Sequence, residues 1–360
     1  TDVRSSKESL NYVFTTGRRE EKIQNDDANP DTIGYASIDS GKTWTKVIIE
    51  NTDNLRTNNR HIFAIEDKAY ILSSNTRIHR YNFSTGTIDL VNTKINNLTT
   101  TSIYVKNFEG SHPGILISST NQIYYATIDS NFTNLTSLDN SISTNITNIV
   151  ASDGYGNKVY FVGNGIQSVD YSATIPTLET SITTGTYKTV SAYTDTKAVA
   201  GGDNVISYTI NGGTSWNVVS NIVVDNTALT DYVITRINML PNGKGLAIGN
   251  YDNGTKGLLL YTQDGGSTWE DVPKEKAFYS FGNEDVLRLP SINSMCISGN
   301  GSFVFINTLE DVSGVEEEIT YNSGSSMIYY GLYPGLFDVY NNKVLDVDGG
   351  MNVNGQILQF

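Results

Sequence analysis

The sequence predicts an all-β fold made of repeated four-stranded units, and three observations support that prediction. A polar string of the form Ser/Thr-X-Asp-X-Gly-X-Thr-Trp recurs with starts at Ser37, Thr209 and Thr262. Worn copies at 125–135 and 168–175, with a still weaker match at Arg80 to Ile88, bring the starts to roughly 40 to 55 residues apart, the period of one four-stranded propeller blade. Short apolar runs separated by turn residues fill the intervals. We therefore predict a seven-bladed β-propeller of four-stranded antiparallel blades.

One interval shows the blade most clearly. Between the copies at Thr209 and Thr262 the runs YVITRINML, KGLAIGN and KGLLLYT precede the motif, and WEDV follows it. They are interpreted as strands A to D, which places the motif in the turn between strands C and D. The same interpretation gives seven blades at about residues 1–50, 58–93, 100–138, 145–183, 187–222, 231–273 and 290–342.

The first blade is short of one strand, because only NYVFTTG, IGYASI and WTKVIIE are evident there. Either Val344 to Val347 or Val353 to Leu358, both in the C-terminal segment 343–360, could complete it. Residues 1–10 are the alternative source. In that case the C-terminal segment would project as the start of a fibre stem.

The repeated string resembles the Asp-box, or bacterial neuraminidase repeat, of sialidases, sortilin-type receptors, xyloglucan-degrading glycosidases and certain photosystem assembly factors. In the second copy Asn211 replaces the Asp and Ser215 replaces the Thr; a still weaker match lies at Arg80 to Ile88. The resemblance implies a propeller whose C-to-D turns lie on the face opposite the ligand mouth. It does not imply one activity, because the families that share the motif do unrelated things.

Turn chemistry predicts a folding role for the motif. Its Asp can accept hydrogen bonds from backbone N–H groups of the same turn, its Gly supplies a positive φ, and its hydroxyls tie the ends together. Its Trp begins strand D as a large apolar anchor between blades. The structural set is Ser37, Asp39, Gly41, Thr43, Trp44, Asn211, Gly213, Trp216, Asp264, Gly266, Thr268 and Trp269.

Loop length predicts the functional face. In such a blade the A-to-B and C-to-D turns lie on one side, here called the clasp face, and the B-to-C and D-to-A connections on the other, the loop face. The longest connections are GRREEKIQNDDANPDT and ENTDNLRTNNR in blade one, PKEKAFYSFGNEDVLRLPS after blade six and LEDVSGVEEEITYNSGS in blade seven. Long loops on a rigid scaffold commonly carry binding residues. We therefore expect a ligand mouth formed by blades six, seven and one.

Arginines and aromatic residues concentrate in these connections. Arginine can bind carboxylate, sulfate or phosphate groups with two hydrogen bonds. The alternative is a solvated rim in which the arginines pair with nearby acidic residues. The ligand-binding candidates are Arg18, Arg19, Arg56, Arg60, Arg77, Arg288, Tyr279 and Phe281.

A catalytic function has less support. The resemblance to sialidases implies three arginines, a Tyr–Glu pair and a further acid, and this set cannot be assigned here. A glycosidase would need two suitably spaced carboxylates. Glu284 and Asp285 are the candidates, and neither lies in a recognisable catalytic string.

Composition excludes several function classes. The net charge of -14 and the pI near 4.6 argue against nucleic-acid binding, and no apolar run is long enough for membrane insertion. The three His and the single Cys296 lack metal-ligand spacing, and no cofactor motif occurs, so we expect neither a metal nor a cofactor. Abundant Asn, Thr and Ser with few Lys indicate an extracellular, cell-surface or virion-surface protein.

Three hypotheses remain at this stage. The first is a non-catalytic recognition propeller that binds a glycan or protein receptor. The second is a glycoside hydrolase, sialidase-like or endo-acting, and the third is a scaffold or assembly factor. The segment VLDVDGGMNVNGQILQF resembles the Gly-Asn-Val repeats of bacteriophage tail fibres, which implies a part in a larger multi-chain surface assembly.

Overall fold

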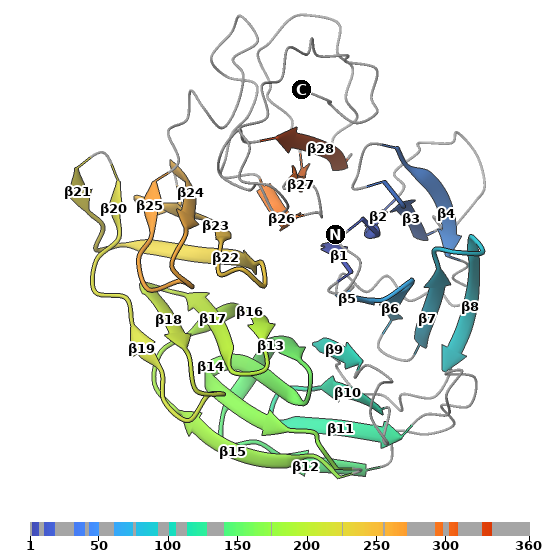
Figure 1. The fold of residues 1–360 in the computed structure, drawn as a ribbon, viewed down its shortest axis with the longest axis horizontal. Coiled ribbons are helices and arrows are strands. Elements are labelled where there is room, and N and C mark those ends of the chain that lie inside the picture. Colours follow the sequence, from blue (N-terminus) through green and yellow to red (C-terminus); the bar gives the residue numbers. More distant parts are fainter. Residues whose placement is uncertain are drawn as a thin grey trace, which may run out of the picture. The chain divides into compact units, whose positions relative to one another are not determined.

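A computed structural model describes residues 2–6, 11–18, 32–39, 43–49, 61–74, 77–92, 101–105, 114–127, 140–173, 175–224, 226–254, 256–271, 292–297, 302–308 and 326–332. These residues form β-strands joined by turns, arranged in seven sheets (Figure 1). Among them no helix is long and apolar enough to cross a bilayer. The chain divides into two compact parts, one formed by Thr1–Ser74, Arg80–Ile88 and Ser291–Phe360 and the other by Asn75–His79 and Asp89–Pro290.

The first part holds the sheets of blades one, two and seven. Blade one has the order β1 (Asp2–Ser5), β2 (Val13–Arg18), β3 (Thr32–Ser37) and β4 (Thr45–Ile49). Blade two has the order β5 (His61–Ile65), β6 (Lys68–Ser74), β7 (Arg77–Asn82) and β8 (Thr87–Asn92), the last two crossing into the second part. Blade seven has β26 (Ile292–Ile297), β27 (Ser302–Thr308) and β28 (Ser326–Leu332).

The first strand of blade one comes from the N-terminal end of the sequence. β1 pairs antiparallel with β2, with Asp2 opposite Thr16 and Ser5 opposite Val13. This selects one of the two sources that the sequence left open. Residues 343–360, the other source, lie outside the described residues.

The second part holds blades three to six. Blade three has β9 (Ser102–Val105), β10 (Gly114–Ser118), β11 (Gln122–Thr127) and β12 (Asn140–Ser143). Blade four has β13 (Thr147–Tyr155), β14 (Lys158–Asp170) and β15 (Thr177–Ile182). Blade five has β16 (Tyr187–Thr194), β17 (Lys197–Gly202), β18 (Val205–Thr209) and β19 (Asn217–Val218).

Two details correct the predicted blade limits. Strand β12 pairs with β11 and begins at Asn140, beyond the predicted end of blade three at 138, because the worn motif there lacks the Gly and Trp that mark the end of the turn. The long β14 folds back on itself. The N–H of Tyr171 donates to the carbonyl of Asn157, so the two ends of β14 lie side by side and blade four also has four strands.

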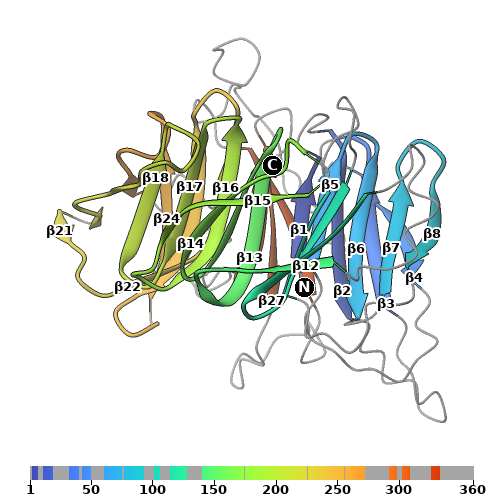
Figure 2. The same cartoon turned by 90° about the horizontal axis from the view of Figure 1, so that it is seen from below.

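Blade six is wider than predicted. Its sheet has the order β21 (Thr227–Ala228), β20 (Val223–Val224), β25 (Glu270–Asp271), β24 (Lys256–Thr262), β23 (Gly245–Tyr251) and β22 (Tyr232–Met239). The hairpin β20–β21 comes from the connection between blades five and six and projects from the edge of this sheet (Figure 2). Ile222 and Val224 are buried, so the hairpin covers an edge that would otherwise remain unpaired.

The apolar core lies between the facing sheets of neighbouring blades. One cluster joins blades one and two through residues such as Phe14, Ile49 and Ile71. Within the second part, one cluster joins blades four and five and another joins blades five and six, the latter including Trp269. Each blade therefore depends on its neighbour to bury its face.

Polar side chains of the preceding blade bind the unpaired edges of β16 and β22, the first strands of blades five and six. Asp153 Oδ2 in blade four accepts the N–H of Ala192 in blade five at 2.9 Å. In blade five, Thr189 Oγ1 and Ser191 Oγ accept the N–H groups of Ile237 and Met239 of blade six at 3.1 and 3.0 Å. Each of these bonds satisfies a buried backbone N–H group of the next blade, so together they fix the register between adjacent blades.

Candidate functional site

Of the ligand-binding candidates on the loop face, Arg18 and Arg77 lie in described strands. β2 ends at Arg18, which lies opposite Thr32, the first residue of β3, so both ends of the 19–31 connection leave from one cross-strand pair. Arg77 is the first residue of β7. For these two arginines the backbone is described. Outside the described residues lie Arg19, Arg56, Arg60, Tyr279, Phe281, Glu284, Asp285 and Arg288.

Blade seven repeats the arrangement seen in blade one. β27 ends at Thr308 and β28 begins at Ser326, and these residues face each other in the ladder. The first strands of the two blades, β1 and β26, pack beside each other within the first part. The long B-to-C connections of blades seven and one therefore belong to neighbouring blades of the first part.

Blades five and six show how the loop face is built where it is fully described. Lys188 Nζ lies 2.7 Å from Asp203 Oδ1, and both side chains are exposed. Asn204 Oδ1 accepts the N–H of Tyr232 at 2.7 Å, while the N–H of Asn204 donates to the carbonyl of Tyr232. The short B-to-C turn of blade five is thus tied to the first strand of blade six.

The motif turns on the clasp face form closed hydrogen-bond networks. We call Ser37–Trp44, Thr209–Trp216 and Thr262–Trp269 the clasp turns. In blade six Asp264 Oδ1 accepts the N–H of Thr268 at 3.0 Å and the hydroxyl of Thr262 at 2.9 Å, and Oδ2 accepts the hydroxyl of Thr268 at 2.7 Å. Partial burial opposes ionisation, but hydrogen bonds from Ser267, Thr268 and Thr262 outweigh it and lower the pKa of Asp264 to about 2.

The other two clasp turns repeat these contacts with small changes. In blade one Asp39 accepts the N–H and the hydroxyl of Thr43 at 2.9 and 2.6 Å, and despite burial these bonds lower its pKa. In blade five the neutral Asn211 accepts the N–H of Ser215 at 3.0 Å and donates from Nδ2 to the Ser215 hydroxyl at 2.8 Å. An amide therefore replaces the carboxylate without loss of the network.

The clasp glycines have a second role besides their backbone conformation. Gly213 and Gly266 have φ values of 86 and 88°. A Cβ on Gly213 would lie 2.0 Å from Ser168 Oγ in blade four, and one on Gly266 would lie 2.5 Å from Val199 Cγ2 in blade five. In these two clasp turns the missing side chain thus lets the turn pack against the preceding blade. Gly41, the corresponding residue of blade one, lies outside the described residues.

Two clasp tryptophans, Trp216 and Trp269, pack toward the preceding blade. Trp269 is buried, and its indole N–H donates to the carbonyl of Gly266 at 3.0 Å. Trp216 makes an edge-on contact with Tyr160 of blade four, with ring centroids 5.5 Å apart. Such aromatic pairs contribute roughly 0.5–1.5 kcal/mol beyond burial of their area.

A backbone hydrogen bond that the sequence did not reveal recurs in four blades. The residue three positions after the motif start donates its N–H to the A-to-B turn of the same blade. The four donor–acceptor pairs are Phe83 to Asp67, Tyr171 to Asn157, Gly212 to Thr196 and Gly265 to Gly243. Two of these blades carry only worn copies of the motif, so the turn geometry persists where the residue pattern does not.

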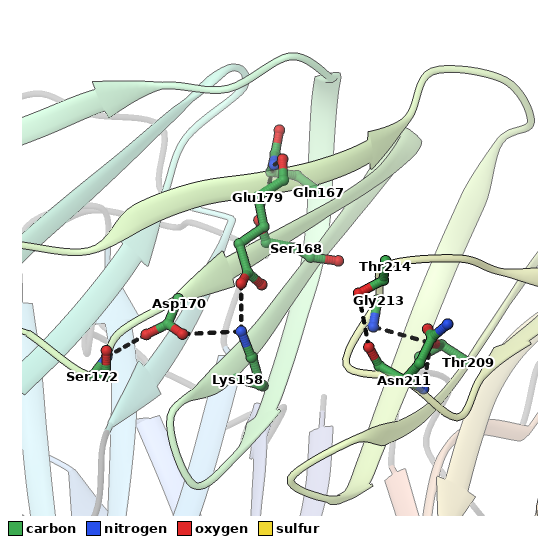
Figure 3. Close-up of polar contacts among 10 residues, drawn as sticks. All are labelled: Lys158, Gln167, Ser168, Asp170, Ser172, Glu179, Thr209, Asn211, Gly213 and Thr214. Carbon is green, nitrogen blue, oxygen red and sulfur yellow. Dashed lines mark hydrogen bonds and ion pairs between the residues drawn. The ribbon is translucent and has the colours of Figure 1, made fainter.

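Blade four carries an altered turn, drawn in Figure 3 beside the clasp turn of blade five. Asp170 occupies the Asp position and accepts the N–H of Ser172 at 2.7 Å. Its other oxygen binds Lys158 Nζ at 2.9 Å, and Glu179 Oε1 lies 2.5 Å from the same nitrogen. Burial disfavours the Lys158 cation, but its bonds to Glu179 and Asp170 prevail and raise its pKa.

Beside the clasp turn of blade six, Tyr261 and Glu270 form a hydrogen-bonded pair as cross-strand partners of β24 and β25. In the described part of the chain, no group of three or more His, Cys, Asp or Glu residues could hold a metal ion. Cys296 is buried and makes no disulfide.

Comparison with known proteins establishes the fold. No family model matches the chain, and no curated protein matches it. The WD40 repeats of RRP9 superpose with a TM-score of 0.55 at 10% identity, covering 91% of this chain and 92% of that one. YCF48 bound to D1 peptide gives 0.51 at 13%, covering 84% and 88%, and Chaetomium thermophilum Sqt1 bound to the N-terminus of ribosomal protein L10 gives 0.50 at 12%, covering 85% and 82%. At these identities the likeness shows the fold alone, which is a β-propeller of successive four-stranded antiparallel sheets.

Proposed function

We propose that this chain is a non-catalytic recognition propeller that binds a glycan or protein receptor through the loop face of blades six, seven and one. It acts outside the cell as part of a surface or virion appendage. From the resemblance of its clasp turns to the Asp-box, we infer that the motif stabilises the scaffold. The C-terminal segment leads toward the rest of a larger assembly.

The observation that supports this proposal is the contrast between the two faces. On the clasp face the turns satisfy their own polar groups, as the closed network around Asp264 illustrates. On the loop face the neighbouring blades seven and one have strands separated by the connections 309–325 and 19–31, and residues 272–291 lead from blade six into blade seven. Long connections anchored on paired strand ends are suited to shape a binding surface.

Two similar structures support binding by this fold. Sqt1 is bound to the N-terminus of ribosomal protein L10, and YCF48 is bound to a D1 peptide. Propellers with this arrangement can therefore bind a segment of another protein. The arginines of the loop face favour a ligand that presents carboxylate, sulfate or phosphate groups.

The test is binding of the purified chain to a glycan array, repeated with Arg18→Ala, Arg19→Ala and Arg288→Ala. Loss of one guanidinium contact should weaken binding at least about tenfold. The matched control is Lys197→Ala, which removes an exposed cation from the clasp-face turn of blade five and should leave binding unchanged. Binding that Lys197→Ala abolishes and the arginine variants retain would contradict the proposal, and an array without any bound glycan would contradict its carbohydrate form.

The same array distinguishes the hydrolase alternative. A glycosidase would cleave a bound glycan, and Glu284→Gln or Asp285→Asn would abolish turnover while preserving binding. We expect binding without turnover. Release of a cleaved sugar that depends on either carboxylate would replace the recognition proposal with an enzyme.

A further inference from the structure

Asparagine residues that precede glycine can deamidate spontaneously, and the folded structure controls how fast each one reacts. The backbone N of the glycine can attack Cγ of the preceding asparagine because no β-carbon on the second residue hinders the approach. Ammonia leaves and a cyclic imide forms, which water then opens to aspartate or isoaspartate. Six such pairs occur in the sequence, and the four described ones start at Asn164, Asn211, Asn242 and Asn253.

Asn253 lies in an open turn. It belongs to the B-to-C turn of blade six, where Asp252, Asn253 and Gly254 are all exposed and have φ values of 56, 55 and 83°. A Cβ on Gly254 would meet only Asn250 Oδ1, at 3.9 Å. The backbone N–H of Asn253 contacts Asp231 at 3.4 Å, while its side-chain amide makes no hydrogen bond within the described part of the chain.

Asn211 is held away from this reaction by the clasp turn. Its Oδ1 accepts the hydroxyl of Thr209 at 3.0 Å (Figure 3). The same oxygen accepts the N–H of Ser215 at 3.0 Å, and Nδ2 donates to the Ser215 hydroxyl. The attacking N–H of Gly212 donates to the carbonyl of Thr196 at 2.8 Å. Both reacting groups are therefore occupied.

The remaining two pairs are also restrained. Asn242 Oδ1 accepts the N–H of Lys244 at 3.0 Å, and the N–H of Gly243 donates to the carbonyl of Leu240. Asn164 donates to the hydroxyl of Thr147. These sites can react only when the local structure opens, which costs free energy that Asn253 does not require.

We propose that Asn253 is a site of spontaneous deamidation in the folded protein and that Asn211 and Asn242 are protected. The reaction replaces a neutral amide by a carboxylate next to Asp231 and Asp252. It therefore adds one negative charge to the loop-face end of blade six. This inference is independent of the proposed receptor binding.

The test is incubation of the full chain at mildly alkaline pH, followed by tryptic digestion and mass spectrometry. Cleavage after Arg236, Lys244 and Lys256 places Asn242 and Asn253 in separate peptides, residues 237–244 and 245–256. We expect the 245–256 peptide to gain the mass that accompanies replacement of NH₂ by OH at least about tenfold faster than the 237–244 peptide. Equal rates for Asn253 and either restrained asparagine would overturn the proposal.

Two further measurements show whether the folded structure or the local sequence determines that Asn253 deamidates selectively. In denaturant all the Asn-Gly pairs should react at similar rates, so the selectivity for Asn253 should disappear. The variant Asn253→Gln should keep the folded chain unmodified in the 245–256 peptide. A native chain in which Asn253 stays intact while it reacts in denaturant would show that the turn protects it, contrary to the proposal.

Discussion

The turns between strands C and D of blades four and six occupy the same position in the fold, but blade four carries a strongly altered motif and blade six a close copy. Blade six ties its turn with Asp264 and the hydroxyls of Thr262 and Thr268. Blade four keeps the acid, as Asp170, but pairs it with the cation of Lys158 from the A-to-B turn. In both blades the fourth residue of the turn donates its N–H to the A-to-B turn. The backbone geometry is thus the common element, and several side-chain sets can support it.

The two turns also contact the preceding blade differently. In blade six this fourth residue is Gly265, and Tyr193 of blade five donates its hydroxyl to the Gly265 carbonyl at 3.0 Å. In blade four the fourth residue is itself aromatic: Tyr171 is buried and donates to the carbonyl of Ala126 in blade three. The aromatic ring at the junction between two blades can therefore belong either to the preceding blade or to the turn itself. A sequence search for the full motif therefore finds the turn of blade six but not that of blade four.

The largest expected effect is steric. Gly213→Ala would place a Cβ 2.0 Å from Ser168 Oγ and 2.9 Å from Tyr160 Cε1, at a φ of 86°. We expect a loss of about 2–4 kcal/mol in the free energy of unfolding. The matched control is Gly212→Ala, which has a similar φ of 72° but whose Cβ would meet nothing closer than 3.6 Å, and we expect about 1 kcal/mol. Denaturant unfolding measures both, and equal losses would show that packing against blade four is unimportant.

The next effect comes from removal of the clasp acid. Asp264→Ala leaves the N–H groups of Ser267 and Thr268 without their acceptor, and we expect a loss of about 1–2 kcal/mol because the turn is largely exposed. Asp264→Asn should cost less, since Asn211 makes the equivalent bonds in blade five. Thermal unfolding of the two variants tests this order. If the Asn variant were as unstable as the Ala variant, the charge rather than the hydrogen bonds would stabilise the turn.

The same residue predicts a pH dependence. The folded pKa of Asp264, about 2, lies below its ordinary value of 3.8, so its contribution is fully present above pH 3.8 and is lost as pH falls toward 2. Asp264→Asn should therefore destabilise the chain at neutral pH and approach the parent protein as the pH falls through this window. Unfolding midpoints measured as a function of pH test the prediction. A constant difference between the two proteins would contradict it.

The smallest effect is expected in blade four. Lys158→Met removes the ion pairs with Asp170 and Glu179, which are partly exposed, so we expect only about 0.2–1 kcal/mol, decreasing with added salt. The raised pKa of Lys158 means that its contribution is present below its ordinary value of 10.5 and is lost at higher pH. Urea unfolding at low and high salt measures the effect. A loss that salt does not change would indicate packing of the lysine stem instead.

The sequence was sufficient for the fold and for the local chemistry of the clasp turns. The period of the motif and the four apolar runs per interval predict the propeller, and the solved structures confirm it. The bonds from Asp264 to Thr268 span four residues, so turn chemistry alone anticipates them. The pairing of Lys158 with Asp170 and Glu179 depends on the fold-back of β14, which no local pattern specifies.

Other features were missed for identifiable reasons. The choice of Asp2–Ser5 as the first strand of blade one depends on pairing across a connection, and its short run has no distinctive pattern. The hairpin β20–β21 did have a signal, because the β-branched Val223, Val224 and Thr227 flank Asp225 and Asn226, and Asn226 has a φ of 63°. The backbone bonds from the fourth turn residue to the A-to-B turn involve no particular side chain, so residue types cannot reveal them.

Glycan-array binding of two variants tests most directly the claim that the clasp face stabilises the fold while the loop face binds the ligand. One is the double substitution Arg18→Ala with Arg19→Ala on the loop face, and the other is Asp264→Ala on the clasp face, measured well below its unfolding temperature. We expect the arginine variant to lose binding with unchanged thermal stability, and the Asp264 variant to lose stability with unchanged binding. A folded Asp264 variant that no longer binds, together with an arginine variant that binds normally, would contradict the account.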